Sequence, residues 1–121
     1  MAKDKQLFEI KDGVVATEEV MAIIAGLAAT EADGVSSLDG NLTSANIAKA
    51  GYSKLQKGVR ILCNDDESVS VHMALNINYG VEIPTVCKSA QEKVKSTLEN
   101  MTGLTVKDVD IRIASVAMAT N

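Results

Sequence analysis

The sequence predicts an α+β fold, a two-layer sandwich in which a mostly antiparallel sheet carries helices on one face. Three observations lead to this class. Two segments alternate apolar and polar residues around a polar turn, two further segments repeat apolar residues with helical periodicity, and a last alternating segment follows the second helix. A split β-α-β connection, as in ferredoxin-like domains, is the simplest topology for this order.

The first part of the chain predicts a hairpin followed by a helix. Asp12-Gly13 lies between apolar pairs, as is typical of a tight hairpin turn. Thr17 is a suitable N-cap for the helix, and Asp33-Gly34 is expected to end it. The side of this helix that we expect to cover the sheet carries Val20, Ile23, Ile24, Leu27 and Ala28, which follow the spacing of one helical face.

The other side of the same helix carries four small residues, Ala22, Ala25, Gly26 and Ala29, where a surface helix would carry charge. Small residues at this spacing let another backbone approach closely. One interpretation, the commoner use of such a helix, is that residues 40–56 cover this stripe within the domain. The other interpretation is a self-association seam between two copies, which makes the stripe a candidate interaction surface.

The next segment is expected to contain a short strand over 35–38 and a helix that begins at Thr43 or Ser44 and is weakened by Gly51. Between positions 39 and 65 there is no acidic residue, although the segment holds a basic island of four residues: Lys49, Lys54, Lys57 and Arg60. Solvated surface is the ordinary explanation. The functional interpretation is a docking face for a carboxylate-rich partner, a phosphate or an anionic membrane surface.

The second half predicts a hairpin, a helix and a strand. Alternation over 59–63 and 69–77 sets a register that a slip of one residue would spoil. The paired residues are Cys63 with Val69, Ile61 with Val71 and Val59 with Met73.

The helix that follows begins near Pro84 and ends at Gly103. Alternation over 109–113 then predicts the last strand. The apolar stripe of this helix is expected to contain Ile83, Cys87, Ala90, Val94, Leu98 and Met101.

The composition indicates a soluble globular protein with an aliphatic core. Of 121 residues, 46% are hydrophobic and 23% are charged, the net charge is −4, and the only aromatic residues are Phe8, Tyr52 and Tyr79. An acidic chain with so few stacking rings is a poor nucleic-acid binder, so no nucleic-acid partner is expected.

No segment for export or membrane insertion is visible. The first residues are polar and charged, and the longest uncharged apolar run, 20–29, is about half the length of a membrane span. We therefore expect a cytoplasmic protein without direct membrane insertion. No linker divides the chain, so we expect a single domain over 1–121, in which 1–6 and 118–121 are flexible.

No arrangement of residues predicts an active site. His72, the only histidine, is expected on the face opposite Cys63, and both Cys63 and Cys87 are expected to face the core. The two cysteines lack the spacing of zinc or redox sites, and nucleotide-binding glycine motifs are absent. Asp110 and Arg112 are expected to form a surface ion pair. We therefore expect no catalytic residue, no cofactor and no metal.

Short motifs follow one another in a recognisable order over nearly the whole chain. They are Gly13–Val20 with Ile23–Ala25, Gly34-Val35, Lys57–Ile61, Asn78–Gly80, Pro84–Val94 around Gln91, and Met101–Leu104 before Val106, Val109 and Ile111. This order resembles the alkaline shock protein family, the envelope stress-response proteins of Gram-positive bacteria.

The resemblance implies a non-enzymatic cytoplasmic protein that acts near the cell envelope by self-association or by binding a protein partner. Some family members are held at the membrane by a separate anchoring protein, and some are connected with control of fatty-acid synthesis. We therefore expect a homo-oligomer or a protein partner, with membrane association only through that partner. The alternatives are a small-ligand regulatory domain and, less favoured, an RNA-binding domain that uses the basic island.

Overall fold

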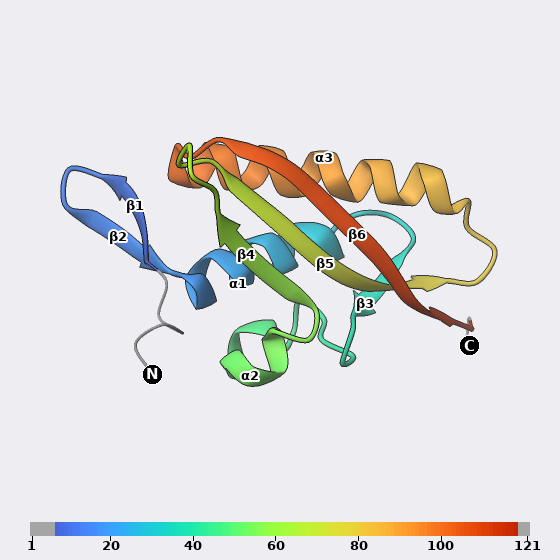
Figure 1. Ribbon diagram of the computed structural model, residues 1–121. Helices are drawn as coiled ribbons and strands as arrows, with labels where there is room; N and C mark the ends of the chain where they lie inside the picture. Colours follow the sequence, from blue (N-terminus) through green and yellow to red (C-terminus); the bar gives the residue numbers. More distant parts are fainter. Residues whose placement is uncertain (1–6, 119–121) are drawn as a thin grey trace.

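The computed structural model of the protein describes residues 7–118, and the fold class is the predicted one (Figure 1). Apart from Met118, the residues expected to be flexible, 1–6 and 118–121, lie outside this range. The elements in chain order are β1 (Leu7–Lys11), β2 (Val14–Thr17), α1 (Glu18–Thr30), β3 (Val35–Leu38), η2 (Ile47–Lys49), α2 (Tyr52–Leu55), β4 (Val59–Cys63), β5 (Val69–Asn78), α3 (Ile83–Thr102) and β6 (Val106–Ala117).

The main sheet is built around β5. Strand β6 runs parallel to β5 along its whole length, while β4 and β3 share the other side, antiparallel to its first and second halves. The predicted register of β4 and β5 is confirmed, with Cys63 opposite Val69 and Val59 opposite Met73. Strands β1 and β2 form a separate two-stranded sheet, which projects from one end of the molecule (Figure 1).

The crossover from β5 through α3 to β6 joins two adjacent parallel strands. Within residues 7–118 no other strand lies between them, so the connection is not the split arrangement that we expected. A parallel connection needs a crossover of about a dozen residues or more, and the 20 residues of α3 supply it directly.

Helices α1 and α3 both lie on one face of the main sheet, and no helix of residues 7–118 lies on the opposite face (Figure 1). The core lies between these layers. Helix α3 faces it with residues spaced four apart, from Val86 to Thr102. Ile83 and Met101, which were expected in this stripe, are 45% and 65% exposed, because each lies three residues, and not four, from a member of the stripe, Val86 and Leu98 respectively. Residue Cys87 is partly buried.

The most deeply buried side of helix α1 is the small-residue side, not the predicted one, of which Ala28 is buried and Ile23, Ile24 and Leu27 are partly buried against the core. The four small residues of the stripe, Ala22, Ala25, Gly26 and Ala29, are all buried, whereas Val20 is 46% exposed. A Cβ atom on Gly26 would lie 3.0 Å from Leu38 Cδ1 and 3.4 Å from Ile47 Cδ1, so the small residues allow close approach to β3 and η2. The domain itself covers the stripe, partly with Ile47, and no exposed seam for self-association exists there.

The boundaries of several elements follow the local signals. Asp12 and Gly13 have positive φ in the β1–β2 turn, and the Thr17 hydroxyl caps α1 by accepting from the Val20 N–H at 3.2 Å. The single helix expected from Thr43 or Ser44 is instead divided into η2 and α2. Gly51 separates them at φ 84°, a conformation that suits glycine and that ends a right-handed helix.

Candidate functional site

The helix-free face of the main sheet holds polar side chains from three neighbouring strands. Arg60 of β4 lies directly opposite His72 of β5, and His72 lies opposite Asp110 of β6. Two residues further along each strand, Ala74 of β5 lies opposite Arg112 of β6. Because side chains of a strand alternate between its faces, all of these residues are on the side away from α1 and α3.

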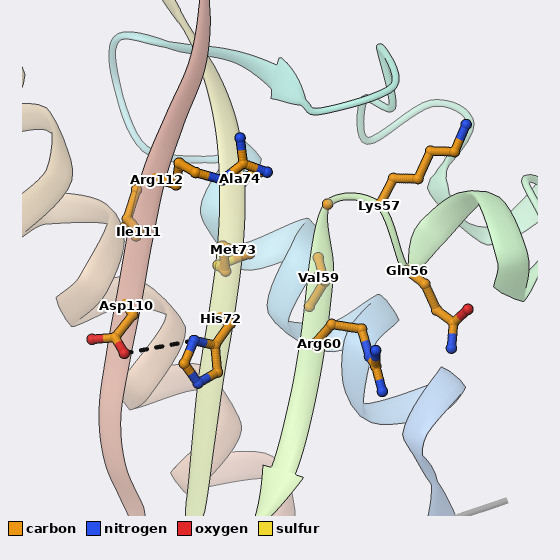
Figure 2. A pocket seen from close by; sticks show the side chains of 11 residues that line it. Gln56, Lys57, Val59, Arg60, His72, Met73, Ala74, Asp110, Ile111 and Arg112 are labelled. Carbon is orange, nitrogen blue, oxygen red and sulfur yellow. Dashed lines mark ion pairs between the residues drawn. The ribbon is translucent and has the colours of Figure 1, made fainter. Parts of the chain in front are cut away.

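A groove of about 390 Å³ lies on this face, and we call it the sheet-face groove (Figure 2). Of the residues that line it, Ala74 and Gly58 have the smallest side chains. The Ala74 N–H donates a hydrogen bond of 2.9 Å to the Gly58 carbonyl. The polar residues that line it are Gln56, Lys57, Arg60, His72, Asp110 and Arg112.

Gly58 is required by close packing. A Cβ atom at this position would lie 3.0 Å from the Cβ of Leu38 and 3.2 Å from the carbonyl oxygen of Asp39, which is backbone and cannot move cheaply. The missing side chain therefore brings the segment after β3 against the start of β4.

The charged residues of the groove form weak, exposed pairs across strands. His72 Nδ1 lies 3.6 Å from Asp110 Oδ2, and Arg112 Nη2 lies 3.9 Å from Asp39 Oδ2. The predicted ion pair between Asp110 and Arg112 is therefore wrong, because Asp110 pairs with His72 and Arg112 with Asp39. Exposed pairs at such distances contribute little to stability, so these side chains are held loosely enough to exchange partners. Figure 2 shows Arg112 reaching from β6 towards Ala74.

A tighter cluster adjoins the groove at Arg60. The carboxylate of Glu18, the first residue of α1, accepts hydrogen bonds from Tyr52 Oη at 2.6 Å, Arg60 Nε at 2.9 Å and the Ile61 N–H at 3.0 Å. Glu18 is 4% exposed. Burial raises the pKa of Glu18, but the hydrogen bonds from Arg60, Tyr52 and Ile61 outweigh it and hold the pKa below its usual value.

Tyr52 shows the reciprocal effect. Burial, together with its hydrogen bond to the Glu18 carboxylate, raises the pKa of the phenol. The cluster thus links the start of α1, helix α2 and the outer edge of β4 through one buried carboxylate. It fixes the guanidinium of Arg60 at its Nε, and Arg60 also lines the groove.

The structure brings together only part of the predicted candidate surface. Lys57 and Arg60 of the basic island line the sheet-face groove. Lys49 and Lys54 are exposed on η2 and α2 but do not belong to its lining.

Several groove residues were missed as site residues. The sequence placed His72, Asp110 and Arg112 on exposed strand faces, yet nothing in it showed that β5 and β6 are neighbours. Glu18 carried only the signal of an acid in the first turn of a helix. No local pattern connects it with Tyr52, 34 residues further on.

The chemistry available in the groove is hydrogen-bond donation. Its lining holds an amide, an ammonium, two guanidinium groups and an imidazole beside the single carboxylate of Asp110, and one of the guanidinium groups, that of Arg60, already donates to Glu18. Among residues 7–118, no group of three or more His, Cys, Asp or Glu side chains is placed to hold a metal ion. Cys63, expected in the core, is exposed because it is the last residue of β4. The hydrogen-bond donors that line the groove suit an oxyanion as ligand.

Fold and site together define a two-layer α+β domain with a polar, grooved sheet face that no helix covers. The sequence matches the model of the alkaline shock protein 23 family, described as having a cell envelope-related function, over residues 6–118. The chain belongs to this family, and the resemblance in its motifs is confirmed.

Relatives occur in Gram-positive bacteria. The chain is 35% identical to the uncharacterized protein YqhY of Bacillus subtilis over 102 residues, 84% of this chain and 75% of the relative. It is 31% identical to the uncharacterized protein Spy1535 of Streptococcus pyogenes over 103 residues, 85% of this chain and 78% of the relative. No solved structure matches the chain. Within residues 7–118, no helix has the length and apolarity needed to cross a bilayer.

Proposed function

We propose that this protein is a non-enzymatic binding module with an envelope-related role, and that a protein partner docks on the helix-free face of its main sheet. The observation that carries the proposal is the sheet-face groove. It is a hollow lined mainly by hydrogen-bond donors on the main sheet, at the face that no helix of residues 7–118 covers.

Beside the groove, the polar side chains of the same sheet face form hydrogen bonds with one another and with the backbone. The Asn76 amide donates to Ser37 Oγ at 3.0 Å and to the Leu38 carbonyl at 3.1 Å, and its oxygen accepts from Ser115 Oγ at 2.7 Å. A face whose small polar groups are already paired does not need permanent cover. It is suited to a partner that binds reversibly and takes its specificity from a few exposed side chains.

The envelope-related description of the family supports a partner at the cell envelope. A partner anchored in the membrane would bring this protein to the membrane surface without a spanning segment of its own. Stress response and oligomer formation belong to the same proposal, in which a second copy of the chain is one candidate partner.

Site-specific photo-crosslinking in cells tests the docking face. A photoreactive amino acid replaces Gln56 at the groove or, in the control, Lys93 on the exposed side of α3. The proposal predicts a partner that is captured from position 56 and not from position 93. The captured partner, identified and purified, should then bind the unmodified protein and lose affinity for an Arg112→Glu variant. Capture from position 93 alone contradicts the proposal.

A regulatory domain that binds a small ligand is the second candidate function. The groove, at about 390 Å³, is within the range of about 300–1,000 Å³ that small-molecule sites occupy. Thermal shift assays against acyl-CoA and nucleotide libraries discriminate between the two candidates. A ligand at about 100 times its dissociation constant adds about 2.7 kcal/mol to the free energy of unfolding.

A further inference from the structure

We infer that the segment of the partner that enters the sheet-face groove is acidic, and that one of its carboxylates binds over Ala74 between Lys57 and Arg112. The inference rests on the proposed function, because it names the chemistry of the partner that docks there.

The groove holds one unpaired and one loosely paired cation within an acidic protein. Lys57, Arg60 and Arg112 line it together with one acid, Asp110, and the whole chain has a net charge of −4. The charge of Arg60 is engaged by Glu18 at 2.9 Å, whereas Arg112 lies 3.9 Å from Asp39 and Lys57 has no ion pair among residues 7–118. The net negative charge of the chain disfavours non-specific binding of an acidic segment, whereas Lys57 and Arg112 attract one at the groove. Such a contrast steers an anionic ligand to one position and orients it there.

Lys57 supplies a charge that the fold does not use. The ion pairs of residues 7–118 engage Arg60 with Glu18, His72 with Asp110 and Arg112 with Asp39, and none includes Lys57. Its backbone is nevertheless fixed, because its N–H donates to the Lys54 carbonyl at 3.2 Å. An incoming carboxylate would be the first ion-pair partner of a side chain that is already placed at the groove.

Arg112 supplies the second contact. Its guanidinium is 68% exposed and lies 3.9 Å from the Asp39 carboxylate, which is the outer limit of an ion pair. A planar guanidinium binds a carboxylate best through two parallel hydrogen bonds, and the long contact with Asp39 leaves that geometry available. The small side chain of Ala74 leaves space for the carboxylate beside it (Figure 2).

The acids around the groove favour a carboxylate over a phosphate. Asp110 lines it and Asp39 approaches its arginine, so a bound anion experiences repulsion as well as attraction. Attraction and repulsion both rise in proportion to the charge of the ligand, whereas the free-energy cost of removing an anion from water rises more steeply with its charge. A phosphate monoester carries about −1.5 to −2 at neutral pH against −1 for a carboxylate. With this balance of charges, a peptide of singly charged groups fits better than a phosphorylated one.

Fluorescence anisotropy with the purified full chain and labelled peptides tests the inference. Fluorescein-labelled hexaglutamate should bind and hexaglutamine should not, and raising the salt from about 50 mM to about 300 mM should weaken the binding. Lys57→Gln and Arg112→Gln should each weaken it by about fivefold or more, the loss of one charge-assisted contact. The matched control, Lys95→Gln on α3, should bind as the unmodified protein does.

Four results would overturn the inference. The first is that hexaglutamate does not bind, and the second is that Lys95→Gln weakens hexaglutamate binding as much as Lys57→Gln and Arg112→Gln do. The third is that a phosphoserine peptide binds more tightly than hexaglutamate. The fourth is that the protein sediments with phosphatidylglycerol vesicles and does not bind the peptide. If hexaglutamate fails while position 56 still captures a partner, the acidic chemistry is wrong and the docking face stands. If both experiments fail, the proposed function falls as well.

Discussion

Arg60 and Glu18 are joined by an ion pair of 2.9 Å although 42 residues separate them in the chain. The pair connects the first residue of α1 with β4, so the helical layer and the sheet edge meet at one buried carboxylate. Because Arg60 also lines the sheet-face groove, the same contact that stabilises the fold positions a cationic residue of the candidate site.

Replacing Glu18 by Gln should destabilise the protein. The variant loses the charge of a 4% exposed group that accepts three hydrogen bonds, and hydrogen bonds to charged groups contribute about 1.5–3 kcal/mol each. We expect the free energy of unfolding to fall by about 1.5–3 kcal/mol, measured by urea denaturation. The neighbouring Glu19→Gln, which changes only a first-turn charge, should cost less than about 1 kcal/mol. Equal effects of the two substitutions would contradict this account.

The contribution of Glu18 should depend on pH in the acid range. Its pKa is lowered in the folded protein, so the stabilisation is complete above the unfolded value of about 4.3 and is lost as pH falls through the folded pKa. Urea denaturation of the unmodified protein and of Glu18→Gln from neutral pH downwards measures the difference between them. We expect that difference to shrink below about pH 4. A difference that stays constant would show that the folded pKa is not lowered.

Tyr52 should cause the opposite pH dependence at alkaline pH. Its pKa is raised by burial and by the hydrogen bond to Glu18, so its contribution is present below the unfolded value of about 10 and is lost as pH rises through the folded pKa. Thermal unfolding above about pH 9 should therefore show a steeper loss of stability for the unmodified protein than for Tyr52→Phe. Parallel curves for the two proteins would exclude the raised pKa.

Replacing Ala25 by Leu should destabilise the monomer. Ala25 is 0% exposed, and adding volume to a packed core costs about 1–3 kcal/mol. Urea denaturation measures this cost, and sedimentation velocity records the oligomeric state of the same sample. A variant with unchanged stability and a lost oligomer would show that the small-residue stripe is an interface after all. Val20→Ala, at a 46% exposed position of the same helix, is the matched control.

The hairpin and the boundaries of α3 could be predicted because local chemistry fixes them. A slip of the β4–β5 register would exchange buried Ile61 with exposed Arg60, so alternation alone determines the pairing. Gly103 ends α3 at φ 76°, in the left-handed conformation expected of a glycine cap.

The groove could not be predicted, because it depends on contacts between distant segments. Parallel strands have no shared turn to set their register, so the sequence could not show that Asp110 lies opposite His72. The prediction of which side of α1 is more deeply buried was wrong for another reason. Both of its sides are apolar, and the prediction chose the bulkier side, whereas close approach to β3 and η2 requires the small residues around Gly26.

The most direct test of the docking face is amide chemical-shift mapping of the isotope-labelled protein during titration with the purified partner captured from position 56. The account predicts that shifts concentrate in β4, β5, β6 and the Gln56–Gly58 segment, centred on Ala74, with little change along the exposed side of α3. Shifts that follow α3 or the β1–β2 hairpin, and leave the residues around Ala74 unchanged, would contradict it.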